Sequence, residues 1–177
     1  ITTEGFRDVI EMRTESRFEQ YDLNLRLPDP LLPRNQRLTL RERINADGEV
    51  LIPLDPAAVD TLTDQIEEGG YQSVAIGLLH SYLNASHERR IAEVLARRLP
   101  GVALSLSSEV SPQMREYERF NTTIANAYIK PLKKSYLGRL EGRLAEQGAV
   151  CPIFLMHSGG GIISLRNCLL YTSDAAD

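Results

Sequence analysis

The middle of the chain alternates between helical and extended hydrophobic spacing. Apolar residues recur every three or four positions in 56–68 and again in 85–99, which predicts two helices with one apolar face each. Nearly continuous apolar runs at 73–79 and 102–106 predict strands that are covered on both faces. Together with a strand at 49–54, the order strand, helix, strand, helix, strand is typical of an α/β layer.

Local signals mark the ends of these elements. Asp55 predicts the cap of the first helix, with Pro56 at its first position, and Asn84 predicts the cap of the second helix. The pair Asp47-Gly48 predicts a turn that leads into the first strand.

The N-terminal quarter is less regular. Residues 1–12 predict the end of a strand followed by a short helix. Residues 13–47 are polar and contain Pro28, Pro30 and Pro33, which block helix interiors and central strands. We expect an extended excursion across the surface with a short strand at 37–43, and an irregular stretch of this length is usually functional or part of an interface.

A long helical region follows at 112–147, and Pro131 predicts a break within it. The apolar run at 152–157 predicts a strand that starts a second α/β layer.

One face of this helical region carries directional hydrogen-bonding groups. Arg115, Arg119, Thr122 and Asn126 are spaced to lie on one side of the helix. The residues expected to pack are off that stripe: Tyr117, Phe120, Ile124 and Tyr128. Such a face suits a ligand or a neighbouring domain, but taken alone it favours a connecting helix whose polar residues only cap and brace.

Two groups of candidate site residues follow predicted strands, where ligands of open α/β sheets collect. His80 and Ser81 follow the strand at 73–79, and His80 is either an acid or base or a histidine that holds the next turn. The run Ser158, Gly159, Gly160 and Gly161 follows the strand at 153–157. It is suited to bind an anion through backbone N–H groups, and it is equally suited to a tight turn.

Three charged side chains have alternative roles. Glu118 and Arg119 are catalytic candidates, because Arg119 is suited to orient a substrate carboxylate or phosphate; an interdomain salt bridge between them is equally compatible with the sequence. Glu88 is expected to cap the first turn of its helix. No Ser-His-Asp order, paired-carboxylate spacing or Walker loop is visible in the sequence.

Composition narrows the class of protein. A formal net charge of −4 and a pI near 5.5 argue against a nucleic-acid partner. No apolar run reaches the roughly 18 residues of a membrane helix, so no membrane is expected. The two cysteines indicate no disulfide framework and favour a cytoplasmic location, and the three histidines lack metal-ligand spacing, so no metal site is predicted.

Four segments in order resemble the hydantoinase A/5-oxoprolinase family. Residues 116–131 (Glu-Tyr-Glu-Arg-Phe-Asn-Thr-Thr-Ile-Ala-Asn-Ala-Tyr-Ile-Lys-Pro) resemble the junction of the family's two domains. The others are residues 1–11, residues 74–84 with His87-Glu88, and the glycine turn at 154–161. Many family members have Ser-Asn-Gly-Gly where this chain has Ser158-Gly159-Gly160, so a family contact at Gly159 is in doubt.

The resemblance implies a fold and a domain division. The fold is α/β, part of a ribonuclease H-like or actin-like ATPase with two domains. Residues 1–118 correspond to the C-terminal part of the first domain and residues 119–167 to the start of the second. The family's Asp-x-Gly-Gly-Thr and Gly-Pro-Ala-Gly phosphate loops do not occur here, so we expect an internal fragment.

The resemblance also implies an activity for the full-length parent. It predicts an ATP- and Mg²⁺-dependent hydrolase that opens a cyclic amide such as a hydantoin or 5-oxoproline, by phosphorylating a poorly electrophilic carbonyl. An alternative is a subunit that carboxylates ketones such as acetone. A hydantoinase B-like subunit or a homo-oligomer is the implied partner. A third possibility is a non-catalytic fragment without a nucleotide site.

The last ten residues depart from the family pattern. Residues 168–177 can be spelled by the codons TGT CTC TTA TAC ACA TCT GAC GCT GCC GAC, which match a transposase adapter used in sequencing libraries. We therefore predict an adapter-derived scar rather than a genuine tail.

Overall fold

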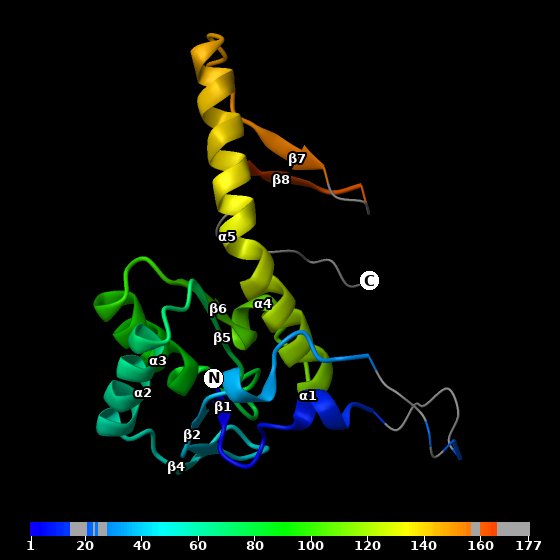
Figure 1. Ribbon diagram of the computed structural model, residues 1–177, viewed down its shortest axis with the longest axis vertical. Coiled ribbons are helices and arrows are strands. Elements are labelled where there is room, and N and C mark those ends of the chain that lie inside the picture. Colours follow the sequence, from blue (N-terminus) through cyan, green and yellow to red (C-terminus); the bar gives the residue numbers. More distant parts are fainter. Residues whose placement is uncertain (15–20, 23, 25–27, 157–159, 166–177) are drawn as a thin grey trace.

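The computed structural model describes residues 1–14, 21–22, 24, 28–156 and 160–165 (Figure 1). Its helices are α1 (Val9–Met12), α2 (Pro56–Glu68), α3 (Ser86–Arg98), α4 (Ser107–Val110) and α5 (Glu116–Glu146), with a 3₁₀ turn at Arg34–Gln36. Its strands are β1 (Thr2–Thr3), β2 (Thr39–Leu40), β3 (Arg43–Ile44), β4 (Val50–Ile52), β5 (Ser73–Ile76), β6 (Ala103–Leu106), β7 (Phe154–Met156) and β8 (Ile162–Ser164).

Four strands form the centre of the structure. β1 pairs in parallel with β2, and β5 pairs in parallel with β6. A parallel bridge between Thr2 and Gly77 joins the two pairs, giving the spatial order β6-β5-β1-β2. This arrangement confirms the predicted α/β class, whereas the finer actin-like, two-domain architecture stays a prediction.

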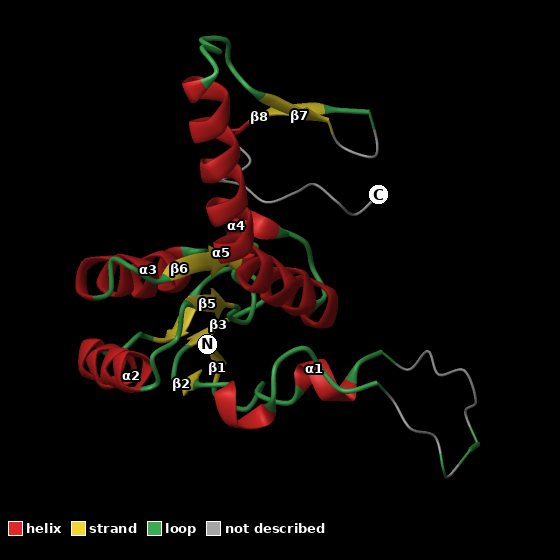
Figure 2. Ribbon diagram, turned by 45° about the horizontal axis from the view of Figure 1, so that its top comes forward, coloured by secondary structure: helices red, strands yellow, loops and turns green. Residues whose placement is uncertain are grey.

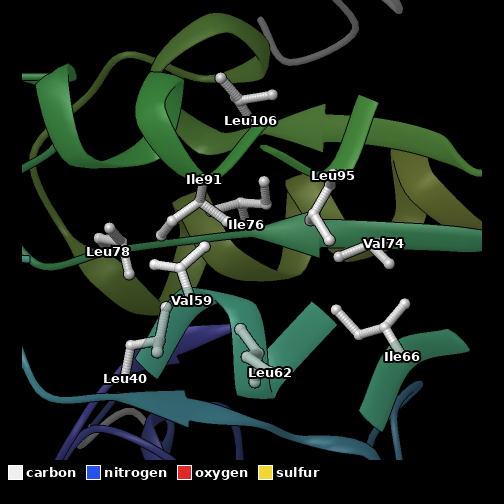
Figure 3. Packing of buried hydrophobic residues seen from close by; sticks show 10 residues of the cluster. All are labelled: Leu40, Val59, Leu62, Ile66, Val74, Ile76, Leu78, Ile91, Leu95 and Leu106. Atoms are coloured by element: carbon white, nitrogen blue, oxygen red, sulfur yellow. The ribbon is translucent and has the colours of Figure 1, made fainter. Parts of the chain in front are cut away.

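Helices cover both faces of these strands. On one face, α2 and α3 bury their apolar stripes against alternate residues of β5 (Figures 2 and 3). The residues of this core are Leu40, Val59, Leu62, Ile66, Val74, Ile76, Leu78, Ile91, Leu95 and Leu106. On the opposite face, the first half of α5 packs against β5 and β6. The strands are therefore covered on both sides, as their continuous apolar runs predict.

The close approach of α5 depends on small residues in β5 and just beyond it. Ala75 and Gly77 point toward α5, because Val74 and Ile76 point toward the other face. A Cβ added to Gly77 would lie 2.6 Å from the Phe120 ring, which is itself buried. Only a residue without a side chain leaves room for that ring.

Several local predictions are confirmed. Asp55 Oδ1 accepts a hydrogen bond from Ala57 N (3.0 Å), which confirms it as the cap of α2. The predicted turn at Asp47-Gly48 is confirmed, since Gly48 has φ +84° and Asn45 Oδ1 accepts from Asp47 N. It joins β3 and β4 as an antiparallel pair.

Other local predictions are wrong. The cap position of α3 is Ala85, one residue later than predicted, although the predicted residue Asn84 still accepts a hydrogen bond from Ser86 N at the start of the helix. α5 runs through Pro131 without ending, since one lost N–H does not outweigh the cooperative hydrogen bonds on either side. Tyr128 does not pack; it is 70% exposed.

The predicted C-terminal strand is present as β7, which forms an antiparallel hairpin with β8 beside the distal half of α5 (Figure 1). That this strand starts a second α/β layer stays a prediction. No helix among the described residues is long and apolar enough to cross a membrane.

The amino terminus lies inside the sheet. The Ile1 ammonium donates a 2.7 Å hydrogen bond to Ala75 O. Burial lowers the pKa of this group from 8.0 to about 6, against an opposing effect of the Glu88 carboxylate. The folded chain therefore holds this proton less tightly than the unfolded chain does.

We predict that replacing Gly77 with Ala lowers the free energy of unfolding by about 1–3 kcal/mol, because the added methyl group overlaps the Phe120 ring. Gly101→Ala is the matched control, since its Cβ would meet open space. Urea denaturation of both variants measures the effect, and equal midpoints would contradict the tight contact.

We predict that the stability of the chain rises between about pH 6 and pH 8, by up to about 3 kcal/mol. The unfolded state binds the Ile1 proton in this range and the folded state does not, so acidification favours unfolding. N-terminal acetylation removes the charge and keeps the N–H donor. The difference between the native and acetylated chains in urea denaturation at each pH isolates this group, and a difference independent of pH would contradict the prediction.

Candidate functional site

Buried polar side chains gather at the carboxyl ends of β5 and β6. Glu88, in α3, is fully buried and points its carboxylate at the backbone beyond these strands. Its Oε1 accepts hydrogen bonds from Leu78 N (2.9 Å) and Ser107 Oγ (2.7 Å), and its Oε2 accepts from Ser108 N (2.9 Å). Glu88 lies in the first turn of α3 as predicted, but its carboxylate makes no capping hydrogen bond to that helix and binds the segments after the two strands instead.

Arg119 reaches the same place from α5. Its exposed fraction is 0%, and its guanidinium donates to Leu78 O (2.9 Å), Gln113 O (2.8 Å) and Ser107 Oγ (3.2 Å). The guanidinium also lies 5.3 Å from the centroid of the Tyr82 ring. Buried Arg119 thus ties α5 to the loops that follow β5 and β6.

A single hydroxyl connects the two charges. Ser107 Oγ donates its one proton to Glu88, so it accepts from both Arg119 Nε and Ser81 Oγ, the latter at 2.9 Å. We call Ser81, Glu88, Ser107 and Arg119 the strand-end network. The hydrogen-bonding capacity of Ser107 is filled, which is what a structural brace requires.

A second buried cluster lies beside it. Glu42 is almost fully buried, and its carboxylate accepts from Thr3 Oγ1 and lies 2.7 Å from His87 Nδ1. Thr3 Oγ1 in turn accepts from Leu79 N (2.9 Å). This cluster ties β1, the segment after β2 and α3 to the end of β5.

His80 differs from both clusters. It follows β5 with φ +55°, an uncommon conformation for a residue with a side chain, and its Nδ1 is buried without a hydrogen-bond partner. Its ring centroid lies 6.1 Å from that of Tyr82. His80 is a sequence-predicted candidate, and its ring nitrogen Nδ1 is without a hydrogen-bond partner at the edge of the sheet where ligands of α/β folds bind.

The predicted polar face of α5 is divided between the sheet and the surface. Asn126 is only 7% exposed; its Nδ2 donates to Ser105 Oγ (3.0 Å), while its Oδ1 is buried without a partner. Thr122 Oγ1 donates to Glu118 O within its own helix. Arg115, the residue before α5, is exposed.

Glu118 does not form the expected pair. Its side chain is exposed, and the carboxylate within ion-pairing distance of Arg119 is that of Glu116, at 3.4 Å. One position along a helix turns a side chain by about 100°, so Glu118 points away from the sheet that Arg119 faces. The catalytic and ligand-binding roles of Glu118, Arg119, Thr122 and Asn126 stay predictions, and the geometry favours bracing for Arg119.

Only part of the predicted glycine turn at 158–161 lies within the described residues. Ser158 and Gly159 lie outside the described residues. Gly160 is exposed with φ +87°, a conformation in which glycine is favoured. Its role as an anion site stays a prediction.

The described residues do not fit a nucleotide and Mg²⁺ by themselves. No three His, Cys, Asp or Glu side chains in the part of the chain that the structure describes are grouped to hold a metal ion. The buried carboxylates of Glu42 and Glu88 are both occupied by protein donors. We therefore derive no chemical step through ATP from these residues.

Sequence reasoning missed three members of the clusters: Thr3, Glu42 and Ser107. A signal for one of them was present. Leu40, Glu42 and Ile44 alternate along an extended segment, and all three are buried. A carboxylate at an inward-facing position indicates a buried partner, here His87.

We predict that Arg119→Ala lowers the free energy of unfolding by about 2–4 kcal/mol, because it removes a fully buried side chain that donates hydrogen bonds to Leu78 O, Gln113 O and Ser107 Oγ. Arg139→Ala, exposed on the same helix, is the matched control and should change stability by less than about 0.5 kcal/mol. Thermal and urea denaturation measure both. An Arg119→Ala chain as stable as the control would rule out the brace.

Comparison with known proteins identifies the family of this chain. The family model described as Hydantoinase/oxoprolinase N-terminal region matches residues 1–99, and the one described as Hydantoinase/oxoprolinase matches residues 119–173. The second match begins inside the first turn of α5 and reaches into the segment predicted to be a scar, which lies beyond the described residues.

Curated relatives of this chain support the same family. The chain is 35% identical over 164 residues to the caprolactamase subunit alpha of Pseudomonas jessenii, covering 92% of this chain and 24% of the relative. It is 29% identical over 189 residues to the 5-oxoprolinase of Saccharomyces cerevisiae, covering 92% of this chain and 14% of the relative. The chain thus spans about a quarter or less of the length of these relatives.

Solved structures share the fold. The crystal structure of ATP-dependent caprolactamase from Pseudomonas jessenii superposes with a TM-score of 0.83 at 36% identity, over 91% of this chain and 24% of that chain. A nucleotide-free acetone carboxylase structure gives a TM-score of 0.76 at 25% identity, over 93% of this chain and 25% of that chain. With both family regions matched in order, this chain belongs to the hydantoinase/oxoprolinase family.

Proposed function

We propose that this chain is part of an ATP-dependent enzyme that hydrolyses a cyclic amide. The observation that carries the proposal is the similarity to caprolactamase, which extends over 91% of the chain at a TM-score of 0.83. Caprolactamase is an ATP-dependent enzyme, and its name denotes action on a lactam. Hydantoins, 5-oxoproline and caprolactam share the ring amide that such an enzyme opens.

A second candidate is ATP-dependent carboxylation of a ketone. It rests on the acetone carboxylase structure, which covers a similar share of the chain at a TM-score of 0.76. The identity is 25% for this structure against 36% for caprolactamase, and this difference favours the hydrolase.

The contribution of the described residues is structural in this proposal. The strand-end network fixes α5 against the edge of the sheet where ligands collect, and His80 is at that edge with an unfilled nitrogen. The groups that bind ATP and Mg²⁺ belong to other parts of the full-length protein. A second subunit is proposed as well, because relatives are named as subunit alpha of caprolactamase and beta subunit of acetone carboxylase.

The proposal is tested on the full-length protein, recovered by reading the source DNA outward from both ends of this sequence and expressed with any adjacent hydantoinase B-like subunit. We expect ring-opened product from 5-oxoproline, a hydantoin or caprolactam, only when ATP and Mg²⁺ are present. Mass spectrometry measures the product and phosphate release measures ATP use. The 177-residue chain alone should give no turnover.

Three results would contradict this. Incorporation of ¹³C-bicarbonate into acetone, without ring opening, would support the carboxylase instead. Ring opening without ATP would remove the proposed activation. Turnover by the 177-residue chain alone would show that its own residues complete the site.

A further inference from the structure

His80 lies where two connections of the sheet diverge. The spatial order β6-β5-β1-β2 places β1 beside β5, and each of these strands connects to its outer neighbour. The connection from β1 to β2 contains α1, which packs against α5, whereas the connection from β5 to β6 contains α3, which packs against α2 on the other face. In open α/β sheets, ligands bind at the carboxyl ends of strands whose connections run to opposite faces. His80 follows the carboxyl end of β5, at this position.

The turn after β5 is closed by the backbone of His80. Its carbonyl oxygen accepts from Leu83 N (3.0 Å) and from Asn84 N (3.3 Å). The imidazole Nδ1, in contrast, is buried without a hydrogen-bond partner among the described residues. The imidazole ring is therefore not needed to close the turn.

The strand-end network holds the backbone on both sides of His80. Both charges of the network bind the Leu78 peptide, one at its N–H and the other at its C=O. Ser81 Oγ lies 2.9 Å from Ser107 Oγ. Between these two fixed points His80 has φ +55°, an uncommon conformation that persists where the surrounding structure enforces it, often at binding and catalytic sites. The network thus fixes the point from which the imidazole projects.

The two ring nitrogens of His80 have different surroundings. The residue is half-buried and Nδ1 is fully buried, so Nε2 is the ring nitrogen that stays accessible. A neutral imidazole carries one N–H, on either nitrogen. A proton on Nδ1 would be a buried donor without an acceptor, and buried unpaired donors are rarer in folded proteins than buried unpaired acceptors. The burial of Nδ1 therefore favours the tautomer that has its proton on Nε2.

The surroundings of His80 favour an uncharged ligand group. The Arg119 guanidinium lies over the Tyr82 ring, but it already donates to three protein acceptors. The nearby carboxylate of Glu88 is bound within the same network. An uncharged N–H donor beside the aromatic ring of Tyr82 suits a carbonyl oxygen on an apolar ring better than it suits a phosphate, which requires positive charge.

We propose that His80 binds the carbonyl oxygen of a neutral cyclic amide through its Nε2–H. His80 is then a hydrogen-bond donor to the ligand and not a general base, because the accessible nitrogen carries the proton. The choice of a cyclic amide rests on the proposed function, whereas the position of the proton does not.

The position of the proton is measured on the 177-residue chain labelled with ¹⁵N-histidine. Two-bond ¹H–¹⁵N correlation spectra distinguish a protonated ring nitrogen from an unprotonated one, and the His80→Asn variant identifies the signals of His80. At about pH 8.5, where an ordinary histidine is neutral, we expect a protonated Nε2 and an unprotonated Nδ1.

The ligand is tested on the full-length protein with two variants. The side-chain amide of Gln reaches the position of histidine Nε2, whereas the shorter amide of Asn reaches only that of Nδ1. Calorimetric titration with caprolactam and with hydantoin, in the absence of ATP, measures Kd independently of turnover. We expect His80→Asn to raise Kd about tenfold, as loss of one hydrogen bond does, and His80→Gln to raise it less than about threefold.

The urea midpoints of both variants in the 177-residue chain control for folding. We expect them to stay close to that of the native chain, because the backbone carbonyl closes the turn and Asn is tolerated at positive φ. A clearly lower midpoint for both variants would show that the imidazole is a structural element, and would overturn the proposal.

The other outcomes are equally defined. Binding that depends on His80 as expected supports the inference even if no ring is opened, so it and the proposed activity can fail separately. A proton on Nδ1, equal weakening by Asn and Gln, or no binding of either cyclic amide to the native protein would each overturn it. Binding of inorganic phosphate that depends on His80, without binding of a cyclic amide, would identify an anion site instead.

Discussion

Two buried charges organise this structure. Glu88 and Arg119 are both fully removed from water, and each must be surrounded by hydrogen-bond partners because an unpaired buried charge is strongly destabilising. Those partners come from separate elements: the Leu78 peptide beyond β5, Ser107 at the start of α4, and Gln113 before α5. Satisfying the two charges therefore fixes the position of α3, the two loops after the strands, and α5 at the same time.

The network gives α5 a different role in each half. Its first half is held against β5 and β6 by Arg119, Asn126 and the contact of Phe120 with Gly77. Its second half leaves the strands and exposes Leu132 and Tyr136 (Figure 1). Since the second family region begins at residue 119, the helix that opens this region packs on the sheet of the first region. The boundary between the two regions is therefore not a boundary in packing.

Much of the α/β unit follows from local pattern. The positions of α2 and β5 were predictable because Val59, Leu62 and Ile66 repeat at helical spacing and residues 73–79 are nearly continuously apolar. The continuity of α5 through Pro131 was not predictable, because a proline is a break signal that neighbouring turns can override. The candidate site was only partly predictable. His80 and Arg119 were identified as candidates from the sequence. Their hydrogen bonding differs, because His80 Nδ1 has no partner whereas the Arg119 guanidinium donates to three groups, and this difference depends on residues far apart in sequence.

The sequence by itself determined the family, the α/β class and the residue types available at the strand ends, because these depend on local spacing and on short motifs that lie within one segment. The tertiary structure alone decided what those residues do. Arg119 is adjacent in sequence to Glu118, yet it is joined to Ser107 and Leu78, and Glu42 is joined to His87 across 45 positions. The hydrogen-bond partners of buried charges depend on how distant segments fold onto one another. The sequence therefore shows which charged residues are present, and only the tertiary structure decides which groups they bind.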